Sequence, residues 1–193
     1  APCHAKLTMS LSLLERSLQK AVELGGEWLY DTQLTGPAAE AAFARVLSQQ
    51  KLNMEQQFIQ QGNAYAAVRA SAHYNVENAA SERCSGVSYY HFLCDLLEKA
   101  DWAGLGAKLE TLRAQVLQHA QLTVSLHGSE QALDTLRTLL PGSRFAAQER
   151  DAAQPYVEPL TPPVNEAFII DGGVNYAVQV WPMERRSDRK ALA

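Results

Sequence analysis

The hydrophobic period of the chain changes within residues 102–127, which read WAGLGAKLETLRAQVLQHAQLTVSLH. In the first part, apolar residues recur at steps of four, three and four, which predicts an amphipathic helix over 102–118. Its predicted buried face consists of Leu105, Leu109, Leu112 and Val116. From Gln121 to His127 every second residue is apolar, which predicts a half-buried strand. A long helix followed by a strand predicts an α+β fold.

A short helix is expected directly after this strand. Gly128-Ser129 offers a turn and an N-cap, leucines follow at helical spacing over residues 133–140, and Pro141-Gly142 stops the helix. This strand–helix unit is the clearest α/β element of the sequence.

Most of the chain before Trp102 is also predicted to be helical. Gly25-Gly26 is typical of a helix stop, Pro37 of a first helical position and Gly62 of another helix end. The predicted helices are 9–24, 37–62, 63–72 and 86–98.

The sequence predicts four regions. Several prolines among polar residues indicate a linker, and the turn Asp171-Gly172-Gly173 between two apolar runs predicts a hairpin. The regions are a helix-rich domain over 1–142, a linker over 143–165, a hairpin over 166–182 and a disordered tail over 183–193.

This set contains too few strands for a stable sheet with a buried face. We therefore expect the partner strands to lie outside the chain. The first residue is Ala1 rather than Met, which agrees with that expectation.

Composition excludes some classes of protein. The formal net charge is −4, with 47% hydrophobic and 20% charged residues, so we expect neither nucleic acid nor membrane as a partner. The three cysteines, Cys3, Cys84 and Cys94, form no CxxC pair. An odd number without such a pair predicts free thiols in a reducing soluble compartment, such as bacterial cytoplasm or an organelle matrix.

The segment Arg69–Leu97, RASAHYNVENAASERCSGVSYYHFLCDLL, resembles the middle of the presequence proteases, a branch of the pitrilysin and insulysin zinc metallopeptidases. Ser81-Glu82, Gly86-Val87-Ser88-Tyr89 and Phe92-Leu93 match that family's Ser-Glu, Gly-[Ile/Val]-x-Tyr and Phe-Leu positions. Three further stretches agree in the same order: Cys3–Leu7, Leu122–Gly128, and Asn165–Phe168 with Val174–Tyr176.

The resemblance implies that the chain is an internal piece, running from within the third domain to the opening of the fourth. It implies a chamber that encloses short unstructured peptides, such as cleaved targeting sequences, and cuts them with zinc. This piece would form non-catalytic chamber wall and pack against the catalytic half of the same polypeptide.

The family's zinc site, an inverted His-x-x-Glu-His helix, has no counterpart at the matching spacing. The histidines are His4, His73, His91, His119 and His127, and no two lie four apart with a Glu between them. We therefore predict no catalytic, cofactor-binding or metal-binding residue in this chain, no activity of the chain alone, and zinc only in the intact protein.

Other reactive or aromatic side chains are each expected to have a structural role. Cys84, His91 and Cys94 could form a metal site, but they offer too few ligands. Cys84 could be a nucleophile assisted by His91, but nothing in the sequence would activate its thiol. Core packing is favoured over both. Ser81 and Glu82 are expected to serve the following helix as a cap or an acidic first turn, rather than to contact substrate. Three aromatic residues are expected to pack in the core rather than line a peptide-binding wall: Tyr89, Tyr90 and Phe92.

The rival interpretation is a stand-alone helical protein-binding module without enzymatic activity. Its partner would dock on an exposed apolar stripe formed by Phe43, Leu47, Met54 and Phe58. An independent hydrolase is not supported, because the sequence offers no nucleophile–base or metal set.

Overall fold

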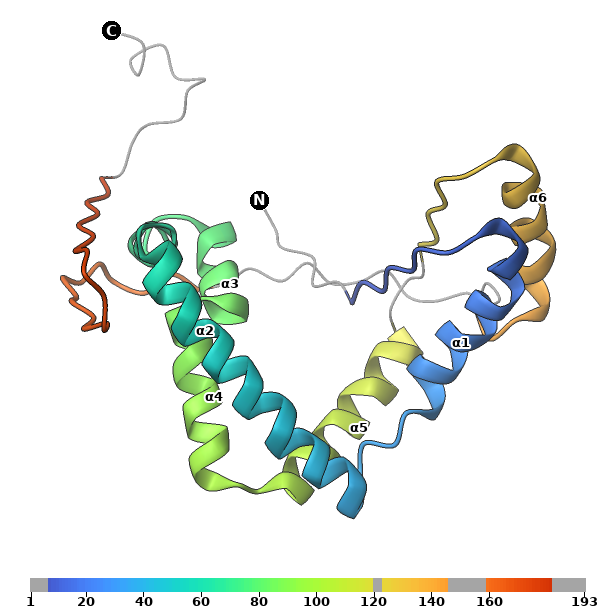
Figure 1. The fold of residues 1–193 in the computed structure, drawn as a ribbon, viewed down its shortest axis with the longest axis horizontal. Helices are drawn as coiled ribbons and strands as arrows, with labels where there is room; N and C mark the ends of the chain where they lie inside the picture. Colours follow the sequence, from blue (N-terminus) through green and yellow to red (C-terminus); the bar gives the residue numbers. More distant parts are fainter. Residues whose placement is uncertain (1–6, 120–122, 146–158, 182–193) are drawn as a thin grey trace, which may run out of the picture. The chain divides into compact units, whose positions relative to one another are not determined.

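The computed structural model describes residues 7–119, 123–145 and 159–181, and its regular elements are helical (Figure 1). Within those ranges there is no strand, so the predicted α+β class is wrong and this part of the chain is all-α. The chain divides into two compact units. The first contains residues 42–101 and 159–181, and the second contains residues 7–41, 102–119 and 123–145.

In the second unit, α1 spans Leu18–Asp31 after a 3-10 turn at Glu15–Ser17. The sequence predicts this helix over 9–24, with a stop at Gly25-Gly26. Both glycines are instead buried inside α1. A Cβ on Gly25 would come within 2.8 Å of the Met9 methyl group, and one on Gly26 within 3.2 Å of the Arg144 side chain. The glycines therefore permit close packing and do not end the helix.

Helix α6, Glu130–Leu139, packs against α1, which lies beside it in Figure 1. Ser129 caps it as predicted, because its hydroxyl accepts a hydrogen bond from the Ala132 amide at 3.2 Å. Ala132 and Leu136 are buried on α6, and Leu18 is buried on α1. The short 3-10 turn Leu140–Gly142 ends the helix where Pro141-Gly142 predicted a stop.

Helix α5, Trp102–His119, begins where the sequence predicted, but its apolar face is phased differently. The Leu112 side chain is 54% exposed, whereas Leu105, Leu109 and Val116 are half-buried. Arg113, one residue further on, donates a 2.6 Å hydrogen bond to the Thr32 carbonyl. The packed face of α5 therefore includes Arg113 and not Leu112, so the prediction of a buried Leu112 is wrong.

Helix α2 runs over Pro37–Ser71, starts at Pro37 as predicted, and belongs to the first unit from residue 42 onward. It does not end at Gly62: the helix kinks at Gln61, whose φ of −132° is not helical, and continues. The Tyr176 ring lies against Gly62, where an added Cβ would be 2.6 Å from it. The glycine thus marks a kink with a close aromatic contact, and residues 63–71 extend the same helix.

Two shorter helices complete this unit. Helix α3, Val76–Ser85, is capped by Asn75, and α4, Val87–Lys99, ends at Ala100 in the left-handed conformation. Gly86 separates α3 from α4, which pack against each other. The core of the unit includes Met54, Ala72, Ala79, Val87 and Leu93.

Neither predicted strand region forms a strand where the structure describes it. Residues 123–127 and 166–181 have no regular structure, so the strand at 121–127 and the hairpin at 166–182 are wrong. A strand exists only when its backbone groups pair with a neighbour. The alternating residues are largely exposed instead: Val124 is 46% and Val174 59% exposed.

Some predictions fall outside the described residues. These include the tail over 183–193, Cys3, His4 and most of the linker. Within the described ranges, no helix combines the length and apolar character needed to cross a bilayer.

Leu93 supplies the sharpest test of this core. Its side chain is 0% exposed, whereas its neighbour Phe92 is 54% exposed. Leu93→Ala is expected to lower the free energy of unfolding by about 2–5 kcal/mol, because the packed core cannot fill the cavity. Phe92→Ala should cost about 0.5 kcal/mol or less. Urea unfolding followed by circular dichroism measures both, and similar losses would show that α4 is wrongly phased.

Candidate functional site

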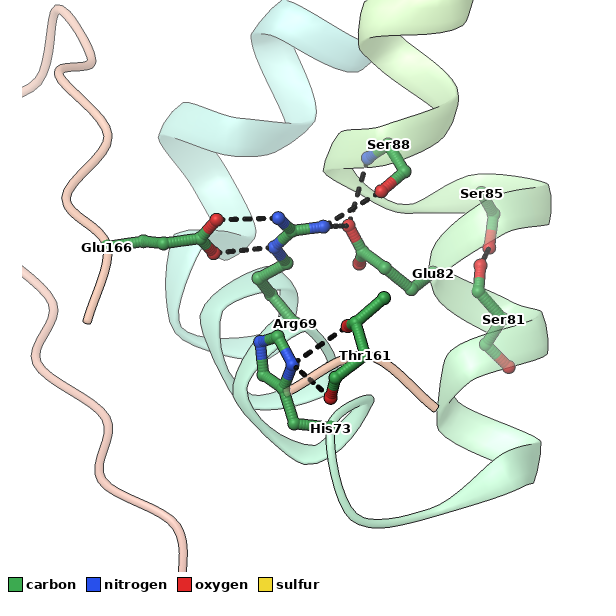
Figure 2. Close-up of polar contacts among 8 residues, drawn as sticks. All are labelled: Arg69, His73, Ser81, Glu82, Ser85, Ser88, Thr161 and Glu166. Carbon is green, nitrogen blue, oxygen red and sulfur yellow. Dashed lines mark hydrogen bonds and ion pairs between the residues drawn. The ribbon is translucent and has the colours of Figure 1, made fainter. Parts of the chain in front are cut away.

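A polar cluster of the first unit surrounds Arg69, in the last turn of α2 (Figure 2). Its Nε and Nη2 donate to the two carboxylate oxygens of Glu166 at 2.7 and 2.6 Å. Its Nη1 donates to Glu82 Oε1 at 3.2 Å and to Ser88 Oγ at 2.8 Å. The guanidinium therefore joins α2 to α3, to α4 and to the segment that carries Glu166. We call Arg69, Glu82, Ser88 and Glu166 the Arg69 cluster.

Glu82 is the buried member of the cluster, with a relative exposure of 3%. Its Oε1 also accepts a 2.9 Å hydrogen bond from the Ser88 amide, in the first turn of α4. A carboxylate at this position satisfies an unpaired helix amide and interacts favourably with the positive end of the helix dipole. The prediction that Glu82 caps the following helix is confirmed. Ser81 contributes only its carbonyl, which accepts from Ser85 Oγ within α3.

Gly86 gives the Glu82 carboxylate the space it occupies. A Cβ on Gly86 would overlap Glu82 Oε2 and lie 2.8 Å from the Glu82 Cα. Oε2 is buried and has no hydrogen-bond partner in the described structure. Glu82, Gly86 and Ser88 thus fit together as one helix junction.

The surroundings of Arg69 and Glu166 favour the charged form of each side chain. The hydrogen bonds to Glu166 raise the pKa of Arg69, against an opposing contribution from desolvation. The hydrogen bonds from Arg69 lower the pKa of Glu166, and the positive potential of His73 and His91 adds to this effect. Because a guanidinium stays protonated in proteins, Arg69 can bind and position a carboxylate but cannot transfer a proton.

A second polar group lies between α2 and α4. The Tyr90 hydroxyl donates to Glu55 Oε1 at 2.7 Å, and Lys51 Nζ lies 2.8 Å from the same oxygen. The hydrogen bond to Glu55 is the main reason that the pKa of Tyr90 is raised well above its usual range. The Tyr90 ring meets Phe58 edge-on, with 5.2 Å between centroids. A tyrosine held in this protonated state serves as a structural hydrogen-bond donor.

The aromatic residues considered from the sequence have different environments. Tyr90 packs between helices, as expected, and Tyr89 is half-buried. Phe92 is exposed, so the expectation that it packs in the core is wrong.

The cysteines and histidines considered as metal ligands or nucleophiles do not come together in one site within the described residues. Cys84 is exposed on α3 and Cys94 is partly buried on α4, so the expectation of core packing fails for Cys84. His91 contacts the Tyr90 ring, and His73 Nδ1 lies 3.0 Å from Thr161 Oγ1. In the part of the chain that the structure describes, no three His, Cys, Asp or Glu residues gather as a metal site would require. His4 and the His119 side chain lie outside what is described.

Sequence reasoning did not pair Arg69 with Glu166, although both lie in the segments that carry the resemblance. The two residues are 97 positions apart, and no periodicity or spacing relates them. Their opposite charges were the only available signal.

In a comparison with known protein families, residues 1–96 of the chain match one family. That family is described as associated with M16 peptidases of subfamily C, so this part is an M16-peptidase-associated region. The match includes Arg69, Glu82 and Ser88, and Glu166 lies beyond it. No solved structure matches the chain.

Gly86→Ala tests the helix junction. The added methyl group must displace the Glu82 carboxylate, which breaks its contacts with the Ser88 amide and Arg69, or shift the Glu82 backbone. We expect a loss of about 1–3 kcal/mol in the free energy of unfolding, as for overpacking in a core.

Gly142→Ala is the matched control, because nothing lies within 4 Å of its added Cβ. Its effect is expected to stay within about 0.5 kcal/mol. Equal urea midpoints for the two variants would contradict the assignment of Gly86 to this junction.

Proposed function

We propose that this chain is a non-catalytic segment of an M16 zinc peptidase and forms part of the wall of its peptide chamber. The observation that carries the proposal is the match of residues 1–96 to the family associated with M16 peptidases of subfamily C. The resemblance of residues 69–97 to presequence proteases supports the finer statement that the substrates are short unstructured peptides, such as cleaved targeting sequences.

The contacts of the motif residues favour this architectural role. Glu82, Gly86 and Ser88 are used in joining α3 to α4, and Arg69 connects that junction to α2. Side chains engaged in this way set the angles between helices. The segment would thus supply a shaped surface, while the zinc and its ligands would belong to the catalytic half of the same polypeptide.

The rival function, a stand-alone docking module, requires an exposed apolar stripe that includes Met54 and Phe58, and these two side chains are packed inside the unit. Met54, in the middle of the proposed stripe, is only 2% exposed. Phe58 is engaged by the rings of Tyr65 and Tyr90 at 4.8 and 5.2 Å. A partner could not reach this face without displacing α4 residues, so no specific observation favours the rival.

The isolated chain is predicted to bind no stoichiometric zinc and to cleave no unstructured fluorogenic peptide. The physical reason is that a zinc peptidase needs three protein ligands and a general base around one ion. Elemental analysis after chelator treatment and a peptide-cleavage assay are the measurements. One tightly held zinc per chain would contradict the prediction, and its loss in Cys94→Ser would locate it.

Co-expression with the zinc-binding half that the proposal requires supplies the positive test. This chain should restore peptide cleavage to that half, and the Gly86→Ala chain should restore less, because its helix junction is disturbed. Gly142→Ala is the control and should act like the unchanged chain. A catalytic half that is fully active alone, and unaffected by this chain, would rule out the chamber-wall role.

A further inference from the structure

Residues 159–181 lie beside the C-terminal end of α2 and have no regular structure of their own (Figure 1). The hydrogen bonds seen between this segment and the helices all involve a side chain. Thr161 meets His73, Glu166 meets Arg69, and the Tyr176 hydroxyl meets the Ile59 carbonyl. The segment is therefore attached at separate points along its length.

The attachment at Glu166 is the strongest of the three. It consists of two parallel, charge-assisted hydrogen bonds of 2.6 and 2.7 Å, the geometry in which arginine binds carboxylates best. Arg69 is held in place from the other side by Glu82 and Ser88, as Figure 2 shows. The helices thus present a guanidinium that is already oriented to receive a carboxylate.

The other attachments are weaker. The Tyr176 hydroxyl lies 3.5 Å from the Ile59 carbonyl, at the limit for a hydrogen bond. His73 Nδ1 lies 3.2 Å from the Thr161 carbonyl, a neutral acceptor. The Tyr176 ring packs against Gly62 of α2, but other apolar side chains of the segment are exposed: Ile169 fully, and Phe168 to 47%.

We propose that residues 159–181 act as a strap, which the Arg69–Glu166 ion pair fastens to helices α2–α4 and which opens without unfolding them when that pair is broken. The helices retain their own junction, because the hydrogen bond from the Ser88 amide to Glu82 lies within α3 and α4 and involves no residue of the strap. The proposal does not rest on the proposed function.

The charges around Glu166 give the direction of the pH dependence. Arg69 and His73 face it from the C-terminal end of α2 and the turn that follows, His91 from α4, and the buried Glu82 of α3 shares Arg69 with it. Hydrogen bonds from Arg69 lower the pKa of Glu166 below its ordinary value of 4.5. The strap is therefore fully fastened above pH 4.5 and opens as the pH falls through the lowered pKa.

Backbone relaxation measured by ¹⁵N nuclear magnetic resonance on the whole chain tests the strap. In the unchanged protein at neutral pH, the amide order parameters of 159–181 should approach those of the helices. In Glu166→Gln they should fall below about 0.6, the range of flexible backbone, with the helical circular dichroism unchanged. Asp171→Asn is the matched control, because Asp171 is an exposed carboxylate of the same segment, and it should behave like the unchanged protein.

Each other outcome counts against the proposal. Equal order parameters in Glu166→Gln and the unchanged protein would mean that the ion pair does not fasten the segment. Loss of helix in Glu166→Gln would mean that the segment belongs to the cooperative core. An equal increase in motion in Asp171→Asn would mean that loss of any negative charge from the segment loosens it.

Discussion

The arrangement of the first unit depends on the neutralisation of one buried carboxylate, that of Glu82. An ionised carboxylate with 3% exposure is costly unless it is paired and hydrogen-bonded. Arg69 supplies the charge from α2 and the Ser88 amide supplies a donor from α4. Because these partners come from different helices, α2, α3 and α4 must meet at this point. The same guanidinium then has donors left for Glu166, which brings residues 159–181 to the helices.

Local signals in the sequence predicted local structure well. Pro37 marks the start of α2, Ser129 caps α6, α5 begins at Trp102, and Glu82 caps the next helix, as expected. Each of these depends on a few neighbouring residues. The helix ends predicted at Gly25-Gly26 and at Gly62 were wrong, because α1 and α2 continue through these glycines. Their role is to let Met9, Arg144 or Tyr176 approach a helix closely, and that need arises only from tertiary packing.

The fold class and the Arg69 cluster required information that the sequence patterns do not contain. Alternation over 121–127 and 174–180 describes which side chains share a face, but a strand also needs a neighbour with which to pair, and the described residues provide none. The pairing of Arg69 with Glu166 spans 97 positions without any periodic signal. The resemblance, by contrast, located the right residues: Glu82, Gly86 and Ser88 lie at its centre, and the match to the M16-peptidase-associated family includes them.

A double-mutant cycle between Arg69 and Glu82 tests the central claim most directly. The free energy of unfolding would be measured in urea for Arg69→Ala, Glu82→Ala and the double variant. If Arg69 neutralises the buried carboxylate, the two losses are strongly non-additive, with a coupling energy of about 1–3 kcal/mol. The reason is that Arg69→Ala leaves the buried Glu82 carboxylate without its cation, a cost that disappears once Glu82 is removed, whereas Arg69 keeps Glu166 in Glu82→Ala. Losses that add to within about 0.5 kcal/mol would contradict the account, since the two residues would then stabilise the helices independently.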